Sequence, residues 1–167
     1  MRKLPIIALF LCTMSAAFSQ KIGHMNSGNL LAQMPEVARA DSVLKLYQND
    51  LLLKRDTIMK AFESEYKAYL GAKQAGTLSA VQDQKRQEAL QKQQQAIQLY
   101  GQDSEQKVGI LRKQLLQPIL GRLDDAIQLI GKEGGYQIIF DSSNGTALFA
   151  TESDDVTPEV KKKLGLK

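Results

Sequence analysis

The sequence has little of what a large folded core or a reactive centre requires. Tryptophan is absent, aromatic residues make up 6% of the 167 residues, and there is one histidine and one cysteine, Cys12. If Cys12 leaves with an N-terminal signal, the mature chain has no disulfide, no thiolate nucleophile and no cysteine metal ligand. After the N-terminal segment, no apolar run approaches the ~20 residues that a membrane-spanning helix needs. The composition therefore argues against a large globular core and against thiol chemistry.

Groups that could serve in catalysis or metal binding are isolated along the chain. His24 has no cysteine partner, and a lone imidazole within a strand is more often packed or solvated than a ligand or a base. The pairs Asp124-Asp125 and Asp154-Asp155 are adjacent, so their side chains diverge in regular structure. Gly134-Gly135 lacks the spacing of a phosphate-binding loop. We expect no catalytic residue, no cofactor and no metal site.

The first 19 residues have the pattern of a cleaved signal peptide. Arg2 and Lys3 give a positive start, residues 4–14 form a short apolar run, and Ala17-Phe18-Ser19 is a small-x-small cleavage site. Phe10-Leu11 lacks the small residue that lipoprotein processing normally needs before a cysteine, which argues against lipid attachment at Cys12. We expect residues 1–19 to be removed and the chain to be exported.

The charge of the chain is only mildly positive. Without Arg2 and Lys3, 20 basic residues stand against 18 acidic ones, and residues 36–118 hold 13 basic and 10 acidic side chains. Nucleic-acid binding calls for a clustered basic face, so we expect no nucleic-acid partner. The run Lys161-Lys162-Lys163 has two interpretations, a solvated helix face or a weak contact with anionic lipid or lipopolysaccharide.

Two long amphipathic patterns predict a helical hairpin over residues 36–117, with its tip near residues 71–79. Gly71 and Gly76 bracket the tip, and Ser79 with Gln82 fits a capping box at the start of the second helix. Pro118 falls inside the second pattern and predicts a kink there. Apolar residues recur every three, four or seven positions on both sides of the tip. They are Val37, Ala40, Leu44, Tyr47, Leu51, Ile58, Phe62, Tyr66 and Tyr69, then Leu90, Ile97, Tyr100, Val108, Leu111, Leu115, Ile119, Leu123, Ile127 and Ile130.

Short β-like segments enclose this hairpin and predict a small head from residues 20–35 and 118–167. Residues 21–26 favour a strand, followed by a short helix that ends before Pro35. Residues 136–141 and 146–151 flank the turn signal Asn144-Gly145 and predict a β-hairpin, and a short helix follows from Thr157. An isolated β-hairpin is marginal in water, so we expect the strand at residues 21–26, together with other subunits, to help bury its apolar side chains. These are Ile138, Phe140, Leu148 and Phe149.

The predicted fold is mainly α with a small β head, an α+β architecture. Segments from opposite ends of the chain can pair only if the intervening residues fold back. A long antiparallel helical hairpin, a coiled-coil arm, would therefore project from a short-stranded β body.

A second apolar stripe lies beside the main helical seam. Leu52, Met59, Tyr66 and Leu70 follow one another by seven, seven and four residues. One interpretation is a surface that binds another protein. The other is that the stripe widens the hairpin seam, as core-facing helices commonly require.

Four segments carry a family resemblance: KIGHMNSGNLLAQMPE (21–36), AGTLSAVQDQK (75–85), YQIIFDSSNG (136–145) and DDVTPEVKKKLGLK (154–167). Together they resemble the Skp/OmpH family of bacterial periplasmic chaperones in its Bacteroidetes-like form. The resemblance implies a periplasmic homotrimer that holds unfolded outer-membrane proteins. His24 departs from the family, which commonly has an aromatic residue there, and the positive charge is smaller than in strongly basic members. The competing hypothesis is an exported coiled-coil adaptor whose hairpin tip binds another envelope complex.

Overall fold

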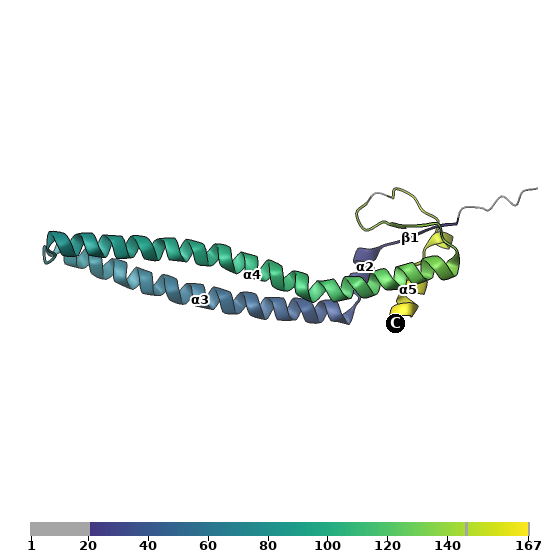
Figure 1. Ribbon diagram of the computed structural model, residues 1–167, viewed down its shortest axis with the longest axis horizontal. Coiled ribbons are helices and arrows are strands. Elements are labelled where there is room, and N and C mark those ends of the chain that lie inside the picture. Colours follow the sequence, from purple (N-terminus) through teal and green to yellow (C-terminus); the bar gives the residue numbers. More distant parts are fainter. Residues whose placement is uncertain (1–20, 146, 167) are drawn as a thin grey trace, which may run out of the picture. The chain divides into compact units, whose positions relative to one another are not determined.

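A computed structural model describes residues 21–145 and 147–166 (Figure 1). The predicted signal peptide lies outside the described residues, as does Thr146. The chain divides into two compact units, which we call the terminal unit and the hairpin unit. The terminal unit combines residues 21–31 with residues 122–145 and 147–166, and the hairpin unit comprises residues 32–121.

The hairpin unit consists of α3 (Pro35–Gln74) and the part of α4 (Ala80–Gly134) that precedes residue 122. Met34 is extended, as expected before a proline, and Pro35 begins the helix with the acidic Glu36 next to it. At the other end, the N–H groups of Ala75, Gly76 and Thr77 donate to carbonyls of the last turn of α3. Gly76 has φ +67°, a conformation that glycine adopts without strain. The turn between α3 and α4 therefore comprises residues 75–79.

The capping box predicted at the start of α4 is also confirmed. The Gln82 N–H donates to Ser79 Oγ at 3.3 Å, and the Ser79 N–H donates to Gln82 Oε1 at 3.0 Å. These reciprocal bonds satisfy two N–H groups that a helix start leaves without partners. Pro118 lies inside α4, which continues as one helix to Gly134, and Gly135 follows with φ +67°.

The terminal unit contains a two-stranded parallel sheet of β1 (Ile22–Met25) and β2 (Ile138–Asp141), with Ile22 opposite Ile138. On the other edge of β1, His24 forms an isolated bridge with Asp155, and its carbonyl accepts from the Val156 N–H at 2.9 Å. Gly23 permits this close packing. A Cβ at that position would lie 3.0 Å from both the Tyr136 ring and Val156 Cγ1.

Three short helical elements complete the terminal unit. α2 (Ser27–Ala32) follows β1, the 3-10 helix η1 (Glu152–Asp154) precedes the bridge at Asp155, and α5 (Thr157–Leu164) ends at Gly165 with φ +73°. Apolar side chains of β1, α2 and α5, together with Val156, meet the C-terminal part of α4 in one small core. It contains Met25, Leu30, Leu123, Ala126, Val156 and Val160.

The predicted β-hairpin of residues 136–141 and 146–151 is wrong. β2 pairs with β1 instead, and residues 147–151 form no strand. The turn after β2 does occur, with the Gly145 N–H donating to Ser142 O. The residues at the start of this turn, however, are bonded to the end of β1 and the start of α2. Ser142 donates to Met25 O through its N–H and its hydroxyl, and the Asp141 carboxylate accepts from the Ser27 N–H and hydroxyl. These bonds direct the segment toward α2 rather than back along β2.

Candidate functional site

Buried apolar side chains and a few polar bonds hold α3 against α4 in the hairpin unit. Tyr100 Oη donates to Leu51 O at 3.4 Å, and Gln93 Nε2 donates to a Glu65 carboxylate oxygen at 2.5 Å. The buried members of the seam on the two helices, up to residue 121, are Ala40, Leu44, Leu51 and Tyr69, with Leu90 and Ile119. All six belong to the predicted seam, whereas Ile58, which was assigned to the same seam, is 37% exposed.

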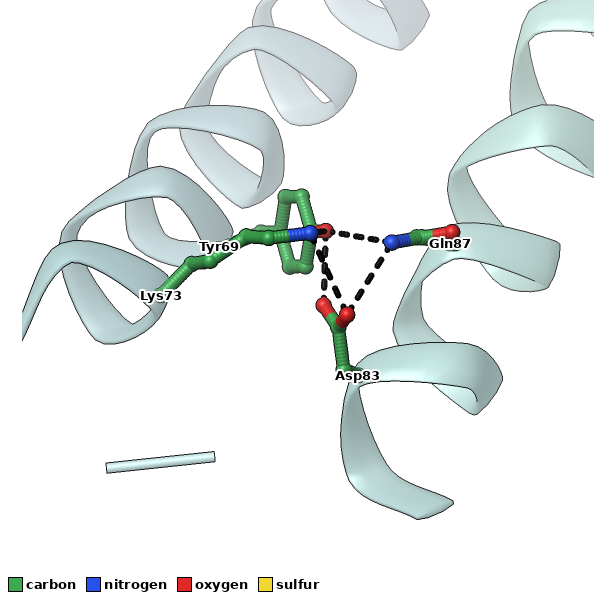
Figure 2. Close-up of polar contacts among 4 residues, drawn as sticks. All are labelled: Tyr69, Lys73, Asp83 and Gln87. Carbon is green, nitrogen blue, oxygen red and sulfur yellow. Dashed lines mark hydrogen bonds and ion pairs between the residues drawn. The ribbon is translucent and has the colours of Figure 1, made fainter. Parts of the chain in front are cut away.

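A polar cluster joins the two helices close to the hairpin tip (Figure 2). Tyr69 Oη donates to Asp83 Oδ1 at 2.7 Å and accepts from Lys73 Nζ at 2.8 Å and from Gln87 Nε2 at 2.9 Å. Lys73 Nζ and Gln87 Nε2 also contact Asp83 Oδ2, each at 3.1 Å. We call these four residues the tip cluster. Sequence spacing assigns Tyr69 to the seam but does not reveal the other three residues as its partners.

The electrostatics of the tip cluster favour its charged state. Hydrogen bonds from Tyr69 and Lys73 lower the pKa of Asp83 below its usual 3.8, despite some desolvation. Hydrogen bonds to Tyr69 and Asp83 raise the pKa of Lys73 above its usual 10.5. Both groups therefore stay charged at neutral pH, bonded to each other and to Tyr69. Such an arrangement closes the tip of the hairpin and leaves no free nucleophile or base.

The four residues of the predicted second stripe are partly exposed. Leu52, Met59, Tyr66 and Leu70 keep 37–47% of their surface accessible, so each is neither a buried seam residue nor a fully solvated one. Tyr66 also stacks on Phe62, with ring centroids 6.0 Å apart. The stripe thus offers apolar surface along α3 while its inner atoms still pack within the hairpin.

Further exposed apolar side chains on both helices were missed from the sequence. They could have been found as apolar residues outside the three-and-four repeat, where a solvated face would otherwise be polar. On α3 they are Val43, Leu46 and Leu53, and on the part of α4 within the hairpin unit they are Val81, Leu99, Ile110 and Leu120.

In the terminal unit, the four residues predicted to be covered by other subunits are exposed in the single chain. Leu148 and Phe149 are 98% and 85% exposed, and Ile138 and Phe140 on β2 are about half exposed. A hollow of about 250 Å³ borders β2, lined by Ile127 and Gly131 of α4 together with Ile138 and Ile139. Gln128, Lys132, Tyr136 and Gln137 also line this hollow, so it combines apolar and polar side chains.

The remaining polar candidates have ordinary structural surroundings. His24 Nε2 lies 3.0 Å from Thr151 O, a distance that suits donation by the ring N–H. Lys163 forms an ion pair with Glu133 at 3.4 Å in the basic last turn of α5. Among residues 21–145 and 147–166, no three His, Cys, Asp or Glu side chains gather in a way that could hold a metal ion. No helix in the same ranges has the length and apolar character to cross a membrane.

Comparison with known proteins decides the family. The family model described as outer membrane protein (OmpH-like) matches residues 21–164, nearly all of the described chain. The chain belongs to the OmpH-like family. The resemblance inferred from the four sequence segments is thereby confirmed.

Two individual proteins are similar to the OmpH-like chain, one in sequence and one in structure. It is 24% identical over 160 residues to the chaperone protein Skp of Yersinia enterocolitica, covering 95% of this chain and 94% of that protein. The structure of a putative outer membrane chaperone (OmpH-like) from Caulobacter crescentus superposes with a TM-score of 0.72. The two share 19% identity, and the match covers 86% of this chain and 83% of the other. The mainly helical fold with a small sheet is thus shared with that protein.

Proposed function

We propose that this OmpH-like chain is an ATP-independent holdase of the periplasm, which binds unfolded outer-membrane proteins and prevents their aggregation in transit. The observation that carries the proposal is the partly exposed apolar stripe Leu52, Met59, Tyr66 and Leu70 on a long solvated hairpin. An unfolded barrel exposes apolar side chains and unpaired strand edges, which aggregate before insertion. Scattered apolar side chains among Lys and Gln can cover such segments by many weak contacts.

The terminal unit supports a homotrimeric assembly as part of the same proposal. Leu148 and Phe149 are 98% and 85% exposed in the single chain, and contact with other copies would remove this apolar surface from water. We propose that Ile138, Phe140, Leu148 and Phe149 pack against the equivalent surfaces of other copies. The hairpins would then remain free for the client.

The hypothesis of a tip-binding adaptor makes different demands on the hairpin. An adaptor tip needs side chains that are free to contact a folded partner. In the tip cluster, Tyr69, Lys73, Asp83 and Gln87 already bond one another. Apolar side chains are instead distributed along the hairpin, which favours the holdase.

The proposal is tested by diluting several unrelated urea-unfolded outer-membrane barrels into buffer with and without the protein, and recording light scattering. A holdase suppresses aggregation of all of them without ATP. An adaptor would suppress none and would bind one folded partner, in a manner abolished by changes at the tip. A parallel assay with anionic vesicles and lipopolysaccharide tests whether Lys161, Lys162 and Lys163 contact lipid.

A further inference from the structure

A groove of about 450 Å³ opens between α3 and α4 within the hairpin unit, between residues 48–55 and 101–108. Leu51, Leu52 and Val108 supply its apolar side chains. Leu51 is buried in the seam, whereas Leu52 of the second stripe is about half exposed. The groove therefore has an apolar floor that is continuous with the seam and open to solvent.

The groove owes its depth in part to Gly101. Glycine destabilises a helix interior relative to alanine, so a glycine in the middle of α4 calls for a reason. Gly101 has no positive φ, and a Cβ built on it would meet no atom within 4 Å. Within residues 21–145 and 147–166, no turn or tight packing requires glycine there. Its missing side chain instead leaves room on the α4 side of the groove.

The polar lining of the groove carries both signs of charge. Arg55 and Glu105 face it from opposite helices, together with the amides of Gln48 and Asn49. Among the described residues, none of these four side chains takes part in a hydrogen bond or an ion pair. The rim thus presents free donors and free acceptors with no net charge. A polyanion would need an excess of positive charge, whereas a neutral polypeptide segment needs donors and acceptors beside an apolar seat.

We propose that this groove seats one apolar side chain of an extended, unfolded polypeptide, with Arg55 and Glu105 bonding the flanking backbone or polar side chains. The proposal rests on the holdase function above and specifies the segment recognised. Side chains alternate along an extended chain, so one apolar residue enters the groove while its two neighbours point away toward water. Segments that alternate apolar and polar residues, as barrel strands do, suit this geometry.

The chain offers a matched pair of variants, Gly101→Leu and Gly109→Leu. Gly109 also lies in the interior of α4 with nothing within 4 Å of a built Cβ, but it does not line the groove. Both changes raise helix propensity alike, and only Gly101→Leu fills the groove. The assay is the Kd for a fluorescently labelled, unfolded outer-membrane barrel. We expect about a fivefold rise for Gly101→Leu and a change within about 1.5-fold for Gly109→Leu, since one seat among many contacts is lost.

Circular dichroism and sedimentation establish that both variants keep the helicity and assembly of the unmodified protein. Equal affinities for the two variants would refute the proposal that the groove binds a client side chain. The proposed holdase function would not be affected by that result. Failure of the unmodified protein to bind any barrel would instead remove the proposed function itself.

A second measurement tests the proposal even if Gly101→Leu disturbs folding, because it does not use that variant. A photoreactive phenylalanine analogue is placed at Ser104, inside the groove, or at Gly109, outside it, and irradiated with the unfolded barrel. Cross-linking to the barrel from position 104 well above that from 109 supports the proposal. Cross-linking only to a second copy of this chain would show that the groove is an interface between copies, and would overturn it.

Discussion

Replacing Leu52, Met59, Tyr66 and Leu70 together with serine separates client binding from hairpin packing. With 37–47% of each side chain exposed, somewhat less than half of its apolar surface is available to a client. Full burial of such a side chain stabilises by about 1.5–3 kcal/mol, so the exposed part contributes about 1 kcal/mol per residue. The four together contribute about 3–4 kcal/mol at most, which corresponds to a rise in Kd of about 100- to 1,000-fold.

The buried part of the same side chains contributes to the hairpin itself. The serine variant should therefore unfold at a lower temperature, yet remain helical at 25 °C, and it should keep its assembly because the proposed interface lies in the terminal unit. Titration of an unfolded, labelled barrel measures the Kd, while circular dichroism and sedimentation report helicity and assembly.

Leu44→Ala is the control for a purely structural effect. Leu44 is buried in the seam, so its truncation costs about 2–5 kcal/mol of stability without removing exposed apolar surface. We expect its Kd to stay close to that of the unmodified protein while helicity persists. If the serine variant instead loses helicity and assembly in parallel, the stripe is seam and our assignment of it to client binding is refuted.

Three further predictions concern assembly, the tip and salt. Phe140→Asp should dissociate the assembly in sedimentation, because burying an unpaired carboxylate is costly, whereas a stable monomer of the unmodified protein would contradict the trimer. Tyr69→Phe should speed amide hydrogen exchange at residues 70–84. In the unmodified protein the same loosening should appear as the pH falls below 3.8 through the lowered pKa of Asp83, because the stabilisation is complete above the ordinary value and is lost on protonation. Unchanged tip exchange in both experiments would refute the role of the tip cluster. Raising NaCl should slow client association but change the affinity by less than about tenfold, or roughly 1.4 kcal/mol, because screening weakens exposed charge contacts and leaves apolar contacts intact. A much steeper loss of affinity would show that charge contacts made by Lys and Arg, rather than apolar contacts, retain the client.

Local signals predicted the helices because each signal acts within a few residues. Pro35 with Glu36, the Ser79 and Gln82 capping box, and Gly135 lie where the structure begins or ends its long helices. The parallel pairing of β1 with β2 depends on residues more than a hundred positions apart. A turn signal such as Asn144-Gly145 predicts a local hairpin, and it could not reveal that Asp141 and Ser142 bond Ser27 and Met25.

The candidate site was predictable only in outline. Spacing placed Leu52, Met59, Tyr66 and Leu70 on one stripe, but how far each side chain packs depends on the residues opposite it on α4. The groove beside Leu52 depends on Gly101, about fifty residues away, and has no signal in either helix alone. The tip cluster likewise needs Tyr69 and Lys73 from α3 to meet Asp83 and Gln87 from α4.

The central claim is that the hairpins hold unfolded barrel proteins by distributed apolar contact. Its most direct test is light scattering of an unfolded outer-membrane barrel diluted into buffer with increasing amounts of the protein, without ATP. The account predicts that scattering is suppressed by the unmodified protein and by Gly109→Leu, and that the serine variant of the stripe suppresses it far less at the same concentration. Equal suppression by the serine variant and the unmodified protein, or no suppression by either, would contradict it.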